Sequence, residues 1–154
     1  MSIASQYVPS PASETEARTP SLDGALIHRL VELVALPEDT ALWWTAMARR
    51  LDELDVAFWE HRSVMEGPSG LFAEVLAAEP RLAFALRACG REIDALAAEL
   101  GRMRLLLAAS MGQDDGVARV AASVADLVSA VRAHQGHVHT VLHEAFLVDI
   151  GFSG

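Results

Sequence analysis

The stretch WTAMARRLDELDVAFWEHRSVM, residues 44–65, decides the fold because its apolar side chains recur at alternating steps of three and four residues. That spacing places them on one face of an α-helix, as in the inward seam of a helical bundle. The seam has seven members, one of them a histidine: Trp44, Met47, Leu51, Leu54, Phe58, His61 and Met65. The pattern therefore predicts a long helix that directs His61 into the protein core.

Three further stretches carry a helical apolar stripe. Residues 81–110 have a seam that includes Ile93, and the only polar member of the seam in residues 116–148 is His134. Residues 22–35 form a shorter helix on which His28 points away from the apolar side, so we expect His28 to be exposed. Breaks separate these stretches at Pro37, at EGPSG (66–70), at Pro80 and at MGQDDG (111–116).

These elements predict an all-α fold, an up-and-down antiparallel four-helix bundle over residues 21–154. The second helix is expected to begin after Pro37, with Glu38 and Asp39 in its first turn, and residues 71–78 are expected to form a short turn. Residues 1–20 are rich in Ser, Pro, Thr and Ala without an apolar run, which is typical of a disordered tail.

Composition narrows the function classes. The chain of 154 residues fits one domain, and its net charge of -9 argues against a nucleic-acid partner, because phosphate backbones require a clustered basic face. The single cysteine, Cys89, cannot form an intrachain disulfide and is read as a buried thiol. Without a secretory signal or a membrane-length apolar run, we expect a cytoplasmic protein with no membrane partner.

The two seam histidines are predicted to meet. If the connecting turns are centred near residues 77 and 113, residue 61 lies level with residue 93, and residue 93 with about residue 133. His61 and His134 would then share a layer of the bundle. The same register brings Glu66 near His137 and His139.

The stretch HQGHVHTVLHEAF, residues 134–146, contains four of the six histidines, but only some of them can face the core. At 100° per residue His134 lies inward and His139 on one shoulder, whereas His137, His143 and Glu144 lie further round the helix. Imidazole and carboxylate together suit Fe, Mn or Zn. The alternative is that His61 and His134 are hydrogen-bonded core residues, Glu92 is an ordinary surface glutamate, and His143 and Glu144 belong to a solvated face.

The succession FWEHRSVMEGPSGLFAEVL…PRL, LRACGREIDAL and VRAHQGHVHTVLHEAFLVDIG resembles the hemerythrin-like (HHE cation-binding) domains, especially the actinobacterial sort, over about residues 22–151. The resemblance implies a four-helix bundle that holds a non-haem di-iron centre with histidines and carboxylates. Members bind or sense oxygen, nitric oxide or iron, or handle peroxides.

The resemblance assigns His61 as the second-helix histidine and Glu66 as the second acid of an H-x-x-x-E-E pattern whose first acid is replaced by Met65. The usual Glu-His of the third helix reads Glu92 and Ile93, so one expected ligand is absent.

On the fourth helix His134 matches the leading histidine, and His137, His139 and finally Glu144 stand where an acid is usual. His28 could be the first-helix histidine, although its angle on the helix points outward.

Three hypotheses follow. The first is a metal-dependent oxidoreductase or sensor acting on oxygen, peroxide or a small organic substrate. It holds one iron ion or a di-iron pair, or Mn or Zn, through ligands drawn from His61, Glu66, Glu92, His134, His137, His139 and Glu144. The second is a metal-free descendant whose core cavity binds an organic molecule or performs acid–base chemistry with His61, Glu66 and His134. The third is an interaction module that packs through its tryptophans as a homodimer.

Overall fold

The computed structural model describes residue 22 and residues 24–146, and within them all regular structure is helical. The elements are α2 (Gly24–Ala35), α3 (Ala41–Glu66), α4 (Leu71–Ala78), a 3-10 turn η1 (Pro80–Leu82), α5 (Ala83–Ser110) and α6 (Gly116–Phe146). The predicted all-α class is confirmed. The expected tail over residues 1–20 and the predicted last turn of the fourth helix lie outside the described residues.

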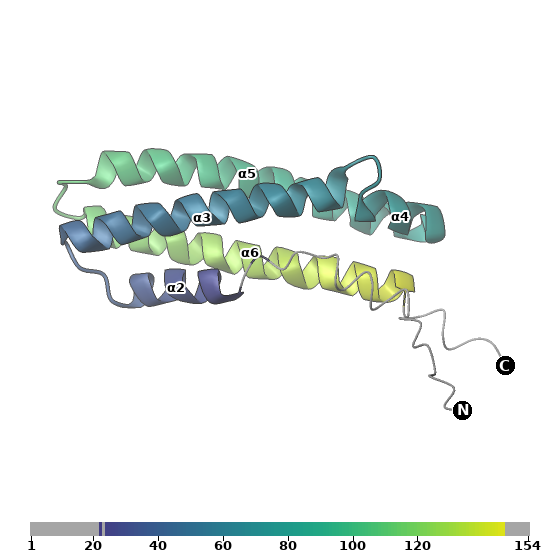
Figure 1. Cartoon of the computed structure of the whole chain (residues 1–154), viewed down its shortest axis with the longest axis horizontal. Helices are drawn as coiled ribbons and strands as arrows, with labels where there is room; N and C mark the ends of the chain where they lie inside the picture. The colour runs from purple at the N-terminus through teal and green to yellow at the C-terminus, as the bar shows by residue number, and fades with distance from the viewer. Residues whose placement is uncertain (1–21, 23, 147–154) are drawn as a thin grey trace, which may run out of the picture.

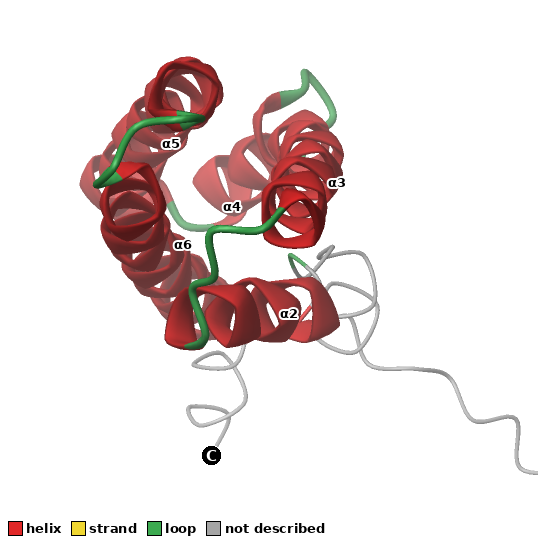
Figure 2. Ribbon diagram, turned by 90° about the vertical axis from the view of Figure 1, so that its left-hand side faces the viewer, coloured by secondary structure: helices red, strands yellow, loops and turns green. Residues whose placement is uncertain are grey.

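Three long helices form the body of the molecule, and a short fourth covers part of it. In Figure 1, α3, α5 and α6 run side by side with alternating direction, and α2 runs antiparallel to α3. The end view in Figure 2 shows these helices arranged around a common interior. α2 has 12 residues and α6 has 31. At about 1.5 Å per residue α2 therefore spans less than half the length of α6.

The core consists of the predicted seams. All seven seam residues of α3 are buried, and on α5 and α6 the seam positions are buried or packed against the core. The largest fully enclosed side chains include Phe58, Met47, Leu54, Ile93 and Leu127. A single period of three and four residues thus places one face of each long helix in a continuous apolar interior.

The start of α3 differs from the prediction. The helix begins at Ala41, because Thr40 is its N-cap and the Thr40 hydroxyl accepts a hydrogen bond from the Trp43 backbone N–H at 3.2 Å. Asp39 therefore lies before the helix, where its carboxylate accepts the indole N–H of Trp44 at 3.0 Å. The expectation that Glu38 and Asp39 lie in the first turn was wrong.

Residues 71–78, expected as a turn, form the two-turn helix α4. Leu71 and Val75 are both fully buried, and their spacing of four residues is satisfied by a helix that packs its apolar side on the bundle.

The α5–α6 connection fixes the register of the last two helices. Gly112 has φ of 77°, a conformation that glycine adopts without the steric cost of a Cβ. At Gly116 an added Cβ would lie 2.0 Å from the backbone oxygen of Ser110, so the start of α6 abuts the end of α5. This tight turn sets which residues of the two helices lie level.

Leu54→Ala is expected to lower the free energy of unfolding by about 2–5 kcal/mol, because it opens a cavity at a fully buried position. Val56→Ala, two residues along the same helix at a position that is 61% exposed, is the control and should change it by less than about 0.5 kcal/mol. Urea unfolding followed by circular dichroism measures both. Equal losses in the two variants would contradict the assigned core face.

Candidate functional site

Two histidines from different helices meet in the core. His61 of α3 is 2% exposed and His134 of α6 is 1% exposed. Their Nε2 atoms lie 3.1 Å apart, and the ring planes are nearly perpendicular at 86°. The predicted common layer is therefore confirmed.

Glu92 of α5 links this pair to the surface. One of its carboxylate oxygens lies 3.6 Å from Nδ1 of His134, slightly beyond hydrogen-bond distance. Both oxygens lie 2.8 Å from Nδ1 of His137, whose side chain is 65% exposed. His137, Glu92, His134 and His61 thus form a continuous line of polar groups from solvent to the core, which we call the His–Glu line.

The surroundings determine the protonation of His134. Burial lowers the pKa of His134 below its ordinary value, and the charge of nearby Glu92 offsets part of this effect, so the ring is neutral at pH 7. A carboxylate beside Nδ1 favours the tautomer with its proton on Nδ1. The Nε2 of His134 then accepts, and the Nε2–H of His61 donates, the hydrogen bond between the rings.

Cys89 lies one turn before Glu92 and is also buried. Burial, with a smaller contribution from the negative charge of Glu92, raises the pKa of the thiol to about 11. The thiol stays protonated at neutral pH, and its burial confirms the expected buried thiol.

The other candidate residues make contacts elsewhere. Glu66 lies near the surface, where its carboxylate accepts a hydrogen bond from Arg62 at 2.9 Å. Glu66 was expected near His137 and His139, but among the described residues it forms no hydrogen bond or ion pair with either; it pairs with Arg62, and His137 binds Glu92.

Further candidates lie on the solvated side of α6 or on α2. His139 and His143 are exposed, with ring centroids 6.3 Å apart. Glu144 lies 4.0 Å from Arg81. His28 is exposed, as expected from its helix angle, and lies 3.3 Å from Glu32.

The described residues do not fit a carboxylate-bridged di-iron centre. They contain no group of three or more His, Cys, Asp or Glu side chains placed to hold a metal ion. Ile93, one residue after Glu92, is fully buried, and Met65 is fully buried where the resemblance expects an acid. The described residues instead bring together two imidazoles, those of His61 and His134, with the Glu92 carboxylate next to His134.

A groove between α5 and α6 was missed by the sequence reasoning. It has a volume of about 520 Å³ and is lined by Glu92, Ala95, Leu96, Glu99, Arg102, Asp126, Leu127, Ala130, Ala133 and His137. The small side chains of Ala95, Ala130 and Ala133 leave room between the two helices. These alanines, on the faces of α5 and α6 next to Glu92, are the sequence signal from which the groove could have been predicted. The outer half of the His–Glu line therefore borders a space large enough for a small molecule.

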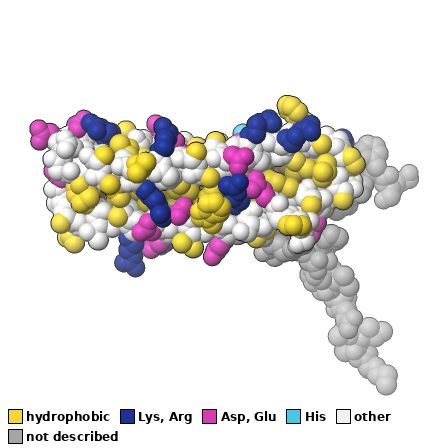
Figure 3. Space-filling model, turned by 90° about the horizontal axis from the view of Figure 1, so that it is seen from above, with side chains coloured by type: hydrophobic (Ala, Val, Ile, Leu, Met, Phe, Trp, Pro, Cys, Tyr) yellow, Lys and Arg dark blue, Asp and Glu magenta, His cyan; other side chains and the backbone are white. Residues whose placement is uncertain are grey.

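Comparisons with known proteins found no match to this chain, either among family models, among curated proteins or among solved structures. Within residues 24–146, none of the helices combines the length and the apolar character needed to cross a bilayer. On the face in Figure 3, arginine side chains lie interspersed with acidic and apolar ones. The absence of a nucleic-acid partner and the cytoplasmic location stay predictions.

The tryptophans divide into two groups. Trp43 and Trp44 are buried and pack edge to face, with ring centroids 5.1 Å apart. Trp59 is exposed, and the guanidinium of Arg62 lies over its ring at 5.4 Å. Within the described chain Trp43 and Trp44 serve the core, so only Trp59 is accessible to a second copy, and the homodimer stays a prediction.

Stability is expected to fall as the pH of metal-free protein is lowered from 7 to 5. The unfolded His134 takes up a proton near its ordinary pKa of about 6.5, whereas the folded ring takes one up only at lower pH. Between these two values the unfolded state binds more protons, so acid favours unfolding, by at most about 1.4 kcal/mol per pH unit for one group.

Urea unfolding at several pH values in the presence of a chelator measures this slope. His134→Gln should flatten it, and His139→Gln, an exposed position on the same helix, should leave it unchanged. Identical slopes in wild type and His134→Gln would contradict the depressed pKa.

Proposed function

We propose that this chain is a hemerythrin-like bundle with reduced ligation that binds a single divalent transition-metal ion between His61 and His134. The observation that carries the proposal is the 3.1 Å separation of the two buried Nε2 atoms. Two imidazole nitrogens, each about 2.1 Å from one ion at an angle of about 90–110°, would lie about 3.0–3.4 Å apart. The helical architecture and the three sequence motifs support the hemerythrin-like part of the proposal.

The protonation of the pair also suits a metal. An imidazole must be neutral to donate its lone pair, and burial keeps His134 neutral at pH 7. The Glu92 oxygen, 3.6 Å from Nδ1 of His134, stands where metal-bound histidines commonly have a carboxylate partner. Glu92 would orient the His134 ring, and its negative charge would offset part of the charge of the ion.

When bound, iron or manganese would supply the oxygen- or peroxide-linked redox chemistry that the resemblance implies, and zinc would supply a Lewis acid. His61 and His134 would hold the ion through Nε2. His61 and His134 are themselves 2% and 1% exposed, so bulk water has little access to the pair. With two protein ligands, coordination positions remain for water or a small substrate. An oxygen or peroxide sensor and a non-haem oxidoreductase are both compatible with this arrangement.

A second candidate is a metal-free protein that binds a small molecule or performs acid–base chemistry. It is favoured by the α5–α6 groove, which Glu92 and His137 line. The His–Glu line would move a proton between a molecule in the groove and the buried pair, since each member lies within 3.6 Å of the next. In this candidate Glu92 and His137 would contact the bound molecule. His134 and His61 would exchange protons with Glu92 without touching the molecule.

Metal titration of chelator-treated protein separates the two candidates. Co²⁺ or Zn²⁺ at about 100 times Kd should stabilise the wild type by about 2.7 kcal/mol, because it binds only the folded state, and isothermal calorimetry should give one ion per chain. His61→Gln and His134→Gln should abolish binding. Glu92→Gln should weaken it by about 10–100-fold, as expected for a residue that orients a ligand.

The control is His139→Gln, which removes an exposed imidazole from α6 and should leave the affinity unchanged. Equal response to metal in wild type and His61→Gln would show that ions bind elsewhere. A wild type whose melting temperature is indifferent to both metal and chelator would overturn the metal proposal in favour of the second candidate.

A further inference from the structure

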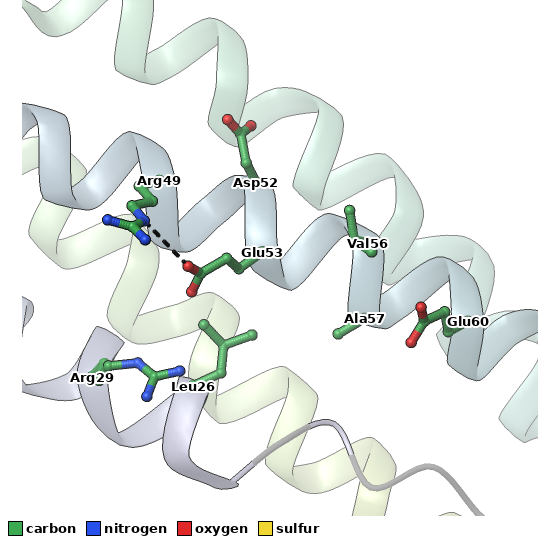
Figure 4. Close-up of a pocket in the computed structure, with 8 residues that line it drawn as sticks. All are labelled: Leu26, Arg29, Arg49, Asp52, Glu53, Val56, Ala57 and Glu60. Carbon is green, nitrogen blue, oxygen red and sulfur yellow. Dashed lines mark ion pairs between the residues drawn. The ribbon is translucent and has the colours of Figure 1, made fainter.

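A second groove lies between α2 and α3, away from the buried histidines. It has a volume of about 700 Å³, within the range of small-molecule sites. Figure 4 shows the side chains that line it: Leu26, Arg29, Arg49, Asp52, Glu53, Val56, Ala57 and Glu60. None of these residues belongs to the His–Glu line. Binding of a molecule in the α2–α3 groove can therefore be tested independently of metal binding at His61 and His134.

Arg29 and Arg49 line one end of this groove, next to Glu53 and Asp52, and Arg50 lies beside it. Glu53 accepts two hydrogen bonds from Arg50, at 2.8 and 2.9 Å, and lies 3.5 Å from Nε of Arg49. The hydrogen bond with Arg50, together with the positive charges of Arg50, Arg29 and Arg49, lowers the pKa of Glu53. The nearby carboxylate of Asp52 accepts instead from Arg104 of α5 at 3.2 Å. Three guanidinium groups thus surround one carboxylate, in a chain whose net charge is -9.

Arg29 has an unused hydrogen-bond donor at this end. Its Nε is enclosed and has no acceptor within hydrogen-bond distance among the described residues. In Figure 4 the Arg29 guanidinium lies along α2 beside Leu26, at the same end of the groove as Arg49. Enclosed donors are normally satisfied, so an unpaired one that borders a groove indicates a missing acceptor. A carboxylate matches the planar, paired donors of a guanidinium.

The rest of the groove is apolar and ends at an acid. Leu26, Val56 and Ala57 provide apolar surface next to the arginines, and Val56 is 61% exposed. Glu60 lies at the end away from Arg49 in Figure 4, where it would repel a second negative group. The occupant therefore has one acidic end and a compact apolar body.

We propose that the α2–α3 groove binds a small amphipathic organic monocarboxylate. Its carboxylate accepts hydrogen bonds from Arg29 and is attracted by Arg49. Its hydrocarbon part covers Leu26, Val56 and Ala57. An inorganic anion would leave this apolar surface exposed. A neutral alcohol would offer Arg29 only an uncharged acceptor, and a cationic amphiphile would offer none.

Octanoate, used below its micelle concentration with chelator-treated protein, is the probe. Isothermal calorimetry should show saturable binding of one octanoate per chain. Octanol and octylammonium, which have the same tail, and acetate, which has the same head group, should each bind at least about tenfold more weakly.

Arg29→Gln should weaken octanoate binding at least about tenfold. Arg49→Gln, a change at a side chain that is 74% exposed, tests the same charge without risk to folding and should weaken it by about three- to tenfold. Arg132→Gln, an exposed arginine on α6, is the matched control and should have no effect.

Octanol binding as tightly as octanoate, or unchanged binding by both Arg29→Gln and Arg49→Gln, would overturn the proposal. His61→Gln should retain octanoate binding, so this test fails or succeeds separately from the metal test.

Discussion

The contact between Nε2 of His61 and Nε2 of His134 constrains the whole bundle. Two polar rings enclosed in an apolar interior are costly unless each finds a partner, and here each provides the partner of the other across 73 residues of sequence. A slip of one residue in either helix would rotate its ring by 100° and leave the other without this contact. The pair therefore specifies one register of α3 against α6, which purely apolar seams specify less strictly.

Glu92 gives this buried pair a connection to its surroundings. Its carboxylate lies between a ring that is nearly inaccessible and a ring that is mostly exposed, and it is close to both. Any change in the charge or position of Glu92 would thus alter the tautomer preference of His134 and, through it, which nitrogen donates between the rings. Buried polar groups such as His61 and His134 are expensive to place in a core, and they are retained here with a carboxylate beside them.

The sequence predicted the fold and the central pair for a simple physical reason. The three-and-four spacing defines one face per helix, and short connections fix which turns lie level, so His61 and His134 could be assigned to one layer.

The groups that were not placed correctly depend on local competition between hydrogen-bond partners. α3 begins at Ala41, after Glu38 and Asp39, because the Thr40 hydroxyl caps it by accepting the Trp43 N–H. Glu66 pairs with Arg62 because that partner is one turn away on the same helix. The rotamer of a long, flexible side chain determines which of several nearby partners it contacts. The spacing of residues along a helix does not predict that rotamer. Both grooves were missed because they arise from small or outward residues on two helices at once.

The short length of α2 bears on how the chain assembles. The helices α3, α5 and α6 follow one another in the chain and can pair as successive hairpins closed by short segments. α2 is joined to α3 by residues 36–40, but it also docks against α6, as in the hydrogen bond from the Gln135 side chain to the backbone oxygen of Leu22, which spans 113 residues. The contact with α6 closes a much longer loop than the contact with α3, and a 12-residue helix gains little from forming alone. α2 is therefore expected to be the last helix to join the bundle and the first to leave it.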